Sequence, residues 1–400
     1  MTSIVRNEYL EQLKALKDKQ VIKIITGIRR CGKSTLLQQF RDYLISIGTD
    51  TSQIISLNFE DLDNEHLCDY HELYTYIRER LHPSLPTYLF FAEIQQVESF
   101  QKVIDALYIK PNIDIYLTGS NAYMLSQDIA TLLSGRYIEI RMLPFSFIEY
   151  SSSISNSTPL STIYKDYVTY GSFPYVFALQ PNHSLVTEYL RNLFNTIVLK
   201  DIVTRYKVAD VMMLQSVIRF MFDNIGNPVS SKSIADTLTS SGRKIDIRTV
   251  EKFLYAMTES YVLYKATRYD IRGKQHLKTL GKYYIVDVGL RMMLLGNRRY
   301  DIGRVLENVI YLELCRRYHD VYVGKWDNTE VDFVCMTENG LVYYQVAETT
   351  REQSTLEREL RPLKQINDSY PKYLLTLDDD PVIDYNGIQK CNAIEWLRRY

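Results

Sequence analysis

Short apolar runs and amphipathic segments alternate along the first part of the chain. The apolar runs predict β-strands at residues 21–26, 53–59, 88–91, 113–118 and 137–140. The segments with helical spacing lie at residues 8–19, 71–81, 100–108 and 122–133. Because strands that alternate with helices form parallel βαβ units, the sequence predicts an α/β domain over residues 1–150. Ligands of such sheets bind at the carboxyl ends of the strands.

A glycine-rich loop joins the first predicted strand to the following helix. It reads Gly27-Ile28-Arg29-Arg30-Cys31-Gly32-Lys33-Ser34-Thr35 and fits the phosphate-loop pattern G-x-x-x-x-G-K-S/T. In such a loop, backbone N–H groups and the helix N-terminus face a phosphate. Lys33 would reach the β- and γ-phosphates, and the Ser34 hydroxyl would bind Mg²⁺. The sequence therefore predicts a P-loop NTPase sheet that binds ATP and Mg²⁺ through Gly27, Arg29, Arg30, Cys31, Gly32, Lys33, Ser34 and Thr35.

Helical spacing continues beyond this domain. A serine-rich stretch at residues 151–159 predicts a linker. Helices are expected at 160–170 and 185–205, and together they predict a helical connector over residues 160–208.

A second group of helices ends in a hairpin. The helices are expected at residues 211–224, 229–238 and 247–261, and residues 264–284 alternate around a turn at Arg272-Gly273-Lys274. Three helices and a hairpin predict a winged helix-turn-helix over residues 209–290.

Basic side chains collect on this predicted winged helix, although the whole chain has a net charge of −1. The candidate contacts are Arg243, Lys244, Arg248, Lys252, Arg272 and Lys274, and the hairpin region also carries Lys265, Arg268, Lys278 and Lys282. A local basic patch predicts contacts with the phosphates of double-stranded DNA. The alternative is that the winged helix contacts protein and that the hairpin lysines protect an edge strand.

The last segment, residues 300–400, predicts a helix followed by three strands. This order resembles the restriction-nuclease-like fold, in which a helix Glu, a strand Asp and a Glu-x-Lys pair hold a divalent metal. The resemblance implies Glu307 and Asp332 as the first two groups, but Gln345 and Ala347 stand where Glu and Lys are expected. We therefore expect a degenerate, inactive site at Glu307, Asp332 and Gln345. An active nuclease and a domain without nuclease ancestry are the alternatives.

Five sequence segments together carry a family resemblance. They read GIRRCGKSTLL, LFFAEIQ, LTGSNAYMLS, LSGRYIEIRMLPFSFIEY and YGSFPYV. They resemble the bacterial and archaeal AAA-type ATPases that pair a P-loop domain with a C-terminal domain of unknown function. The resemblance covers nearly the whole chain and implies an ATPase that works as a homo-oligomer.

One position departs from the family pattern. The family carries Asp-Glu after the third strand, where the Asp helps to hold Mg²⁺ and the Glu polarises the attacking water. Here the pair is Ala92-Glu93, which leaves Glu93 as the candidate base and predicts impaired hydrolysis. Two alternatives are a shifted register in which Glu60 or Asp61 serves the metal, and a deliberate Asp-to-Ala substitution that traps the nucleotide-bound state.

The resemblance implies three further polar residues. Asn58 would restrain the catalytic Glu, and Asn121 would orient the attacking water; both positions also suit turns or helix caps. Arg136, before the fifth strand, would act as an arginine finger toward a neighbouring subunit. The structural alternative is an ion pair of Arg136 with Glu139 or with a carboxylate on the preceding helix.

Composition adds limits on the class of protein. The chain has 400 residues, of which 46% are hydrophobic and 24% charged, as in a globular protein with a core. Its five cysteines are scattered without a C-x-x-C pair, which argues against a disulfide framework or a zinc site. No long apolar run predicts a signal peptide or a membrane span, so we expect a cytoplasmic protein without membrane contacts.

The sequence thus favours an AAA-type ATPase that couples its nucleotide state to the binding of DNA or of a partner. The alternative is a nucleotide-gated binding switch, in defence or regulation, without significant turnover.

Overall fold

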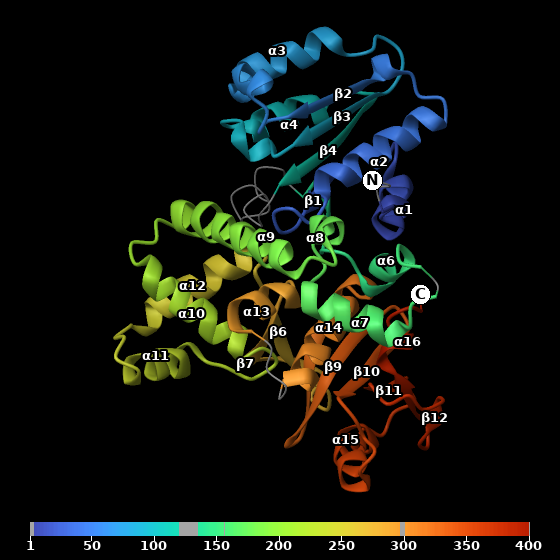
Figure 1. Cartoon of the computed structure of the whole chain (residues 1–400). Coiled ribbons are helices and arrows are strands. Elements are labelled where there is room, and N and C mark those ends of the chain that lie inside the picture. Colours follow the sequence, from blue (N-terminus) through green and yellow to red (C-terminus); the bar gives the residue numbers. More distant parts are fainter. Residues whose placement is uncertain (1–3, 120–134, 156, 297–300, 400) are drawn as a thin grey trace. The chain divides into compact units, whose positions relative to one another are not determined.

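The computed structural model describes residues 4–119, 135–155, 157–296 and 301–399, without the side chains of residues 278–280 (Figure 1). The chain divides into two compact units, residues 1–144 with 259–261 and residues 145–258 with 262–400. No helix in the described ranges is long and apolar enough to cross a membrane.

The first unit is built on a five-stranded parallel sheet. Its elements are α1 (Asn7–Leu16), β1 (Ile22–Thr26), α2 (Lys33–Ser46), η1 (Thr51–Gln53), β2 (Ile54–Asn58), η2 (Leu62–Cys68), α3 (Tyr70–Arg80), β3 (Thr87–Ala92), η3 (Ile94–Gln96), α4 (Phe100–Tyr108), β4 (Ile113–Gly119) and β5 (Tyr137–Arg141). The strand order is β2-β3-β4-β1-β5, and every neighbouring pair is parallel. This arrangement confirms the predicted α/β sheet; the helix expected at residues 122–133 falls on residues 120–134, which are not described.

Helices cover both faces of this sheet because its strand residues are apolar on both sides. On one face, Leu89 and Phe91 belong to a core with residues of α3 and α4, among them Ile77 and Leu107. On the other face, the α2 residue Phe40 packs against the Phe90 and Tyr116 rings, with centroids 6.2 and 5.0 Å away. The two layers hold the carboxyl ends of β1, β3 and β4 at one edge, where the glycine-rich loop begins.

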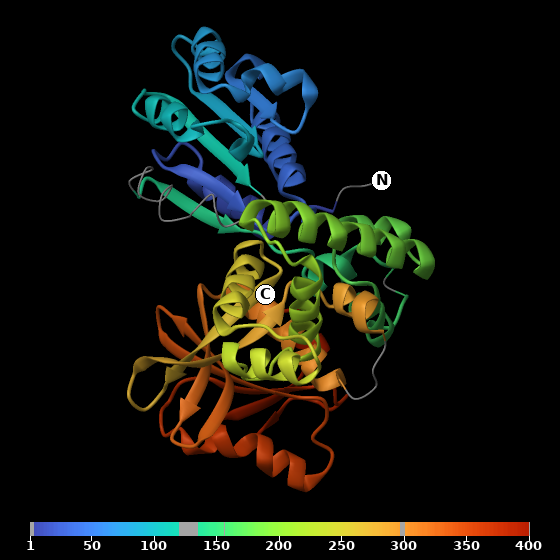
Figure 2. The ribbon, with the colours of Figure 1, turned by 90° about the vertical axis from the view of Figure 1, so that its left-hand side faces the viewer.

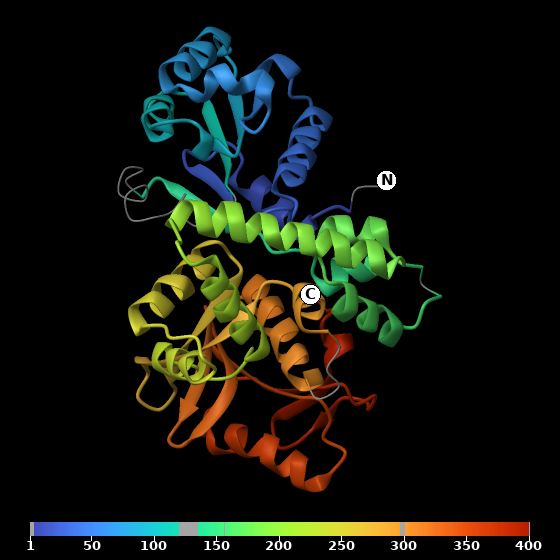
Figure 3. The same ribbon diagram turned by 60° about the vertical axis from the view of Figure 1, so that its left-hand side comes forward.

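The second unit begins with helices. They are α6 (Phe147–Ser152), α7 (Leu160–Tyr170), α8 (Pro174–Leu179), α9 (His183–Thr196), α10 (Val211–Asp223), α11 (Ser231–Ser240), α12 (Ile247–Glu259) and α13 (Val288–Leu295). The expected linker at 151–159 is partly wrong, because Ser151 and Ser152 end α6, which starts on a capping box of Ser146 and Glu149. The helix expected at 185–205 starts earlier, at His183, and continues through a π-helical segment, Ile197–Thr204 (Figure 3).

An eight-stranded mixed sheet forms the rest of the second unit. Its elements are β6 (Leu263–Asp270), β7 (Gln275–Ile285), α14 (Ile302–Arg317), β8 (Asp320–Trp326), β9 (Thr329–Thr337), β10 (Gly340–Ala347), α15 (Gln353–Gln365), β11 (Lys372–Thr376), β12 (Ile383–Asp384), β13 (Ile388–Asn392) and α16 (Ala393–Trp396). The order is β12-β13-β11-β10-β9-β8-β6-β7. Helix α15 covers one face of this sheet (Figure 2). Its residues Leu360 and Leu363 belong to a core cluster with Val334 and Tyr343 of the sheet. On α14, the Tyr311 ring stacks on Tyr284 of β7, with centroids 4.1 Å apart.

The β6–β7 hairpin, which the sequence predicts to be the wing of a winged helix, is not a separate two-stranded sheet. Residues Arg268–Asp270 of β6 pair in parallel with Val323–Lys325 of β8, so the hairpin ends the sheet built by the last segment of the chain. The predicted boundary between residues 209–290 and 300–400 therefore cuts through one sheet. The pairing brings β7 side chains close to α14 and β9. A lysine of β7 therefore lies among the acidic residues described below.

Candidate functional site

The glycine-rich loop runs from the end of β1 to the start of α2. Gly27 has φ +142°, and a Cβ atom on it would lie 2.1 Å from the carbonyl oxygen of Met142. Gly32 has φ +107° and is the N-cap of α2, which receives no hydrogen bond from a capping side chain. Both positions need glycine, one for close backbone approach and the other for a left-handed conformation. The N-terminal N–H groups of α2 are therefore left for an anion.

Lys33 is folded into this loop. Its side chain is 4% exposed, and its Nζ donates to the carbonyl oxygens of Gly27, at 2.9 Å, and Ile28, at 3.2 Å. The same Nζ lies 4.0 Å from Oε1 of Glu93, at the end of β3. The sheet thus brings the lysine of the loop and the carboxylate of the third strand together, although they are sixty residues apart in the chain (Lys33 to Glu93).

The other predicted loop residues occupy different environments. Ser34, Thr35 and Arg30 are exposed, so the Ser34 hydroxyl is accessible to a cation. Arg29 is partly buried and donates to Oε1 of Glu60 over 2.9 Å. Cys31 is fully buried, and burial raises the pKa of its thiol. The donor set of N–H groups, ammonium and hydroxyl fits a magnesium-bound triphosphate.

Arg6, which the sequence patterns did not single out, bonds the glycine-rich loop to the segment that follows β5. It is 2% exposed, and its guanidinium donates to the carbonyl oxygens of Cys31, at 3.0 Å, and Leu143, at 2.8 Å. In the sequence, Arg6 is one arginine before an amphipathic helix. This pattern is too common to predict a contact with the loop.

The end of β3 carries Ala92 and Glu93. Glu93 is buried with φ +54°, and its backbone N–H donates to Oγ1 of Thr118 on β4 over 3.2 Å. Its carboxylate accepts a 2.6 Å hydrogen bond from Nε2 of Gln95. Ala92 closes the strand, opposite Asn58 in the β2–β3 register, and has no side-chain oxygen.

The residues considered as replacements for the missing Asp are engaged elsewhere. Glu60 accepts from Arg29, and Asp61 Oδ1 accepts from the N–H of Asp63 over 3.2 Å. Asn58 Oδ1 accepts from the N–H of Glu60, also over 3.2 Å, which is the bond of a turn. The structure therefore favours the turn interpretation of Asn58.

Arg136 and Asn121 complete the predicted catalytic set. Asn121 lies outside the described residues. Arg136 precedes β5, and its guanidinium lies over the Tyr108 ring, 5.2 Å from the centroid. Glu139, its expected structural partner, instead accepts from Oγ1 of Thr26 over 2.5 Å and pairs with Arg141 at 3.3 Å.

Four of the predicted DNA-binding residues lie on α12 or shortly before it, and the other two lie on the β6–β7 hairpin. Arg248 and Lys252 are exposed and lie four residues apart on α12, and Lys244, which precedes this helix in the chain, is also exposed. Arg243 instead donates to Oγ of Ser216 on α10. On the hairpin, Lys274 is exposed, while Arg272 pairs with Asp327 at 2.9 Å.

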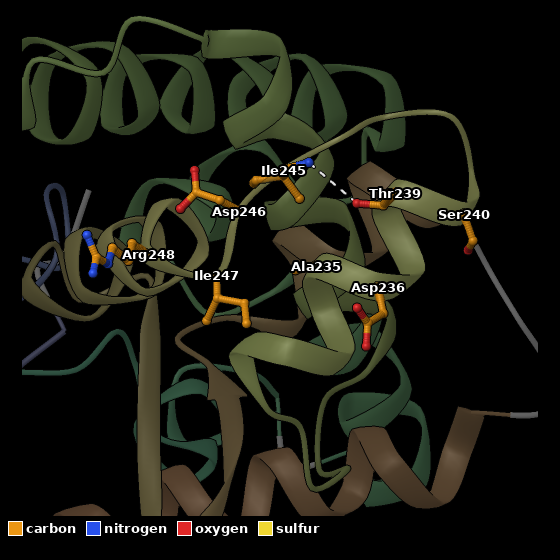
Figure 4. A pocket seen from close by; sticks show the side chains of 8 residues that line it. All are labelled: Ala235, Asp236, Thr239, Ser240, Ile245, Asp246, Ile247 and Arg248. Carbon is orange, nitrogen blue, oxygen red and sulfur yellow. Dashed lines mark hydrogen bonds between the residues drawn. The ribbon is translucent and has the colours of Figure 1, made fainter.

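A surface pocket of about 790 Å³ lies between α11 and α12. Figure 4 shows the side chains that line this pocket. One hydrogen bond joins two of the lining residues, from the N–H of Ile245 to Oγ1 of Thr239 over 3.4 Å. The charged lining residues are Asp236, Asp246 and Arg248, so the pocket has mixed charge. Mixed charge gives it no preference for a phosphate.

The second unit contains a cluster of partly buried acidic residues around the buried Lys282 of β7. Nζ of Lys282 lies 2.9 Å from Glu307 on α14, 2.9 Å from Glu330 on β9, and 3.5 Å from Asp332 on β9. Tyr284 also donates to Glu307, over 2.7 Å. The carboxylates raise the pKa of Lys282 against the effect of its burial, so the ammonium stays charged.

The predicted nuclease-like residues meet in this cluster. Asp332 accepts from the N–H of Val346 over 2.9 Å, and its own N–H donates to Oε1 of Gln345 over 3.3 Å. Nε2 of Gln345 donates to Glu359 on α15 over 3.0 Å. Burial raises the pKa of Asp332 to about 7, although Lys282 acts in the opposite direction.

A cation that the sequence patterns did not assign to this site lies among its carboxylates. Ala347 removes the lysine of the Glu-x-Lys pair, but Lys282 places an ammonium among the same carboxylates. Sequence reasoning counted Lys282 in the basic hairpin and missed Glu330 and Glu359. Within the described residues, no group of three or more His, Cys, Asp or Glu side chains is arranged to hold a metal ion.

Comparison with known proteins gives two domain matches. An AAA domain matches residues 19–151, and a domain of unknown function (DUF8612) matches residues 161–301. An uncharacterized protein of Haemophilus influenzae is 40% identical over 399 residues, 98% of each chain. One of Methanocaldococcus jannaschii is 27% identical over 380 residues, 89% of this chain and 82% of its own.

A solved structure, a Walker-type ATPase of Pyrococcus abyssi, is similar with a TM-score of 0.52 and 16% identity. The match covers 73% of this chain and 95% of the archaeal chain. At this identity, the similarity shows a shared fold.

Proposed function

Because this chain belongs to the family of the Haemophilus influenzae protein and carries an AAA-type P-loop ATPase domain, we propose that it binds MgATP. We further propose that the nucleotide state controls the binding of DNA or of a partner. The observation that carries the proposal is the enclosed position of Lys33, between two loop carbonyls and 4.0 Å from Glu93. This places a phosphate-binding cation beside a candidate general base.

Each residue of the loop has a distinct task in this proposal. The N–H groups at the start of α2 and the ammonium of Lys33 would hold the phosphates, and the Ser34 hydroxyl would hold Mg²⁺. When bound, Mg²⁺ would neutralise negative charge on the phosphate oxygens. Glu93 would orient and deprotonate the attacking water.

A specific observation favours the second candidate, a switch without significant turnover. Ala92 offers no oxygen to the water shell of the metal, while Glu60 and Asp61 already have partners in the structure. A chain with intact phosphate contacts and a weakened metal site would bind ATP better than it hydrolyses it.

Replacing Lys33 with alanine tests the nucleotide site. The substitution removes a charge-assisted contact, so the affinity for MgATP should fall roughly tenfold or more. Titration calorimetry on the full chain measures this affinity, with Lys19→Ala as the control because Lys19 is an exposed lysine of the same unit. Equal affinities of Lys33→Ala and the unmodified chain would contradict the proposal.

The DNA-binding part of the proposal depends on the exposed pair Arg248 and Lys252 on α12. Removing both with alanine should weaken binding of duplex DNA and lower the slope of log affinity against log salt by about 0.9 per lost phosphate contact. Fluorescence anisotropy at several salt concentrations, with and without MgATP, measures both effects. Arg361→Ala with Lys364→Ala on α15 removes the same charges from another exposed surface.

An equal loss of affinity in the α15 control would contradict a DNA site on α12. Undetectable DNA binding by the unmodified chain would favour a protein partner at this surface.

The proposal includes a homo-oligomer in which Arg136 acts on the nucleotide of a neighbouring subunit. Its support is the position of Arg136 before β5, where related ATPases carry an arginine finger, and the Tyr108 ring that holds the guanidinium.

A further inference from the structure

Gln95 makes a side-chain hydrogen bond to the candidate general base. It lies in the short 3₁₀ turn η3, directly after β3, and its Nε2 is 2.6 Å from Oε2 of Glu93. Because an ionised carboxylate can only accept hydrogen bonds, the NH₂ group of the amide faces Glu93 and its oxygen faces away.

The remaining atom of this amide is an unused acceptor. Oε1 of Gln95 is buried and has no hydrogen-bond partner within the part of the chain that the structure describes. A buried acceptor without a partner is unfavourable, and the amide keeps this orientation because its NH₂ group bonds to Glu93.

Gln95 is also held in place by the local fold. The backbone of Glu93 is fixed by Thr118, and the N–H of Gln96 donates to the carbonyl oxygen of Glu93 over 3.0 Å, which closes the turn. Glu93 and Gln95 are therefore held within one closed turn. Asn58, the residue that the family resemblance suggested for restraining the glutamate, is bonded to the N–H of Glu60 instead.

We propose that Gln95 is the positioning residue for Glu93, a role that rests on the proposed ATP hydrolysis. Its NH₂ group holds the carboxylate at the loop edge of the sheet, 4.0 Å from Lys33. Since Gln95 donates to Glu93 and not to the glycine-rich loop, it should affect the chemical step and leave nucleotide binding unchanged.

The test replaces Gln95 with methionine, which keeps the side-chain length and removes both polar atoms. Steady-state hydrolysis and MgATP affinity are measured on the full chain and on the Ala92→Asp variant. In both backgrounds kcat should fall about 10–100-fold, as for a misplaced catalytic group, while KM and MgATP affinity stay the same. Gln96→Met is the matched control, because Gln96 is exposed in the same turn.

A double-substitution cycle separates positioning from folding. When Glu93→Gln has already removed the base, Gln95→Met should lower kcat by less than twofold. A full additional loss in that background, a proportional rise in KM, or an unchanged or increased kcat would each overturn the role.

The outcomes also separate this role from the proposed function. If neither the unmodified chain nor Ala92→Asp binds MgATP, the proposed function fails, and the positioning role fails with it. If both bind and Ala92→Asp hydrolyses ATP, but Gln95→Met keeps the full kcat, the positioning role alone is wrong. Binding without hydrolysis in both backgrounds would also overturn the positioning role, because there would be no reaction for Glu93 to serve.

Discussion

Replacing Lys282 with methionine is expected to lower the free energy of unfolding of the second unit by about 3–5 kcal/mol. The ammonium of Lys282 lies within 3.5 Å of Glu307, Glu330 and Asp332 and is the cation that these carboxylates share. Methionine fills a similar volume but leaves Glu307 and Asp332 facing each other in a largely buried site, while Glu330 keeps its ion pair with Arg268 at 2.6 Å. The loss is much larger than for a surface ion pair, which contributes about 0–1 kcal/mol.

The loss should depend on pH. Because burial already raises the pKa of Asp332 to about 7, this carboxyl binds a proton in the folded state at pH values where the unfolded chain has released it. Acidification therefore neutralises part of the cluster, and the Lys282→Met penalty should be smaller at pH 5 than at pH 8.

Urea unfolding followed by tryptophan fluorescence measures this effect on the second unit alone. The chain has two tryptophans, Trp326 and Trp396, and both belong to that unit. Lys265→Met is the matched control, since Lys265 is exposed on the neighbouring strand β6. Equal midpoints for Lys282→Met and Lys265→Met, or a loss that does not change with pH, would contradict the internal-cation role of Lys282.

Adding Glu307→Gln to Lys282→Met should recover part of the lost stability, because the second substitution removes one of the unpaired charges. This result would show that charge, and not packing of the lysine stem, causes the loss.

The nucleotide site could be predicted from the sequence because its information is local. Gly27, Gly32 and Lys33 lie within one loop, and the strand before it and the helix after it have clear hydrophobic periods. Glu93 could be predicted because the carboxyl ends of parallel strands share one edge. The partner of its carboxylate could not, since both Asn58 and Gln95 are polar residues near strand ends, and only the turn geometry distinguishes them.

The acidic cluster could be predicted only in part. Glu307, Asp332 and Gln345 follow from the order of elements in the last segment, and the structure brings them together. Lys282 does not follow, because it belongs to a hairpin whose pairing with β8 is a long-range contact that no local pattern indicates. A count of basic residues placed it on a DNA-binding surface, whereas its side chain is buried.

Restoring an aspartate at position 92 is expected to raise the rate of ATP hydrolysis about 10–100-fold, the range that a residue supporting a metal site contributes. Ala92 closes β3 beside Glu93, 7% exposed, so a carboxylate there would join the edge of the sheet that carries the glycine-rich loop. The affinity for MgATP should change far less than kcat, because the loop, Lys33 and the first turn of α2 are untouched.

Single-turnover hydrolysis on Ala92→Asp, with Ala92→Asn as the uncharged control of nearly equal shape, decides between the two functions. A gain with Asp and none with Asn would mean that this chain keeps every other part of an ATPase and that the residue at position 92 limits turnover. Equal rates in all three chains would remove position 92 from the explanation. If MgATP still changed DNA affinity in those chains, the binding switch would be the function that the glycine-rich loop serves.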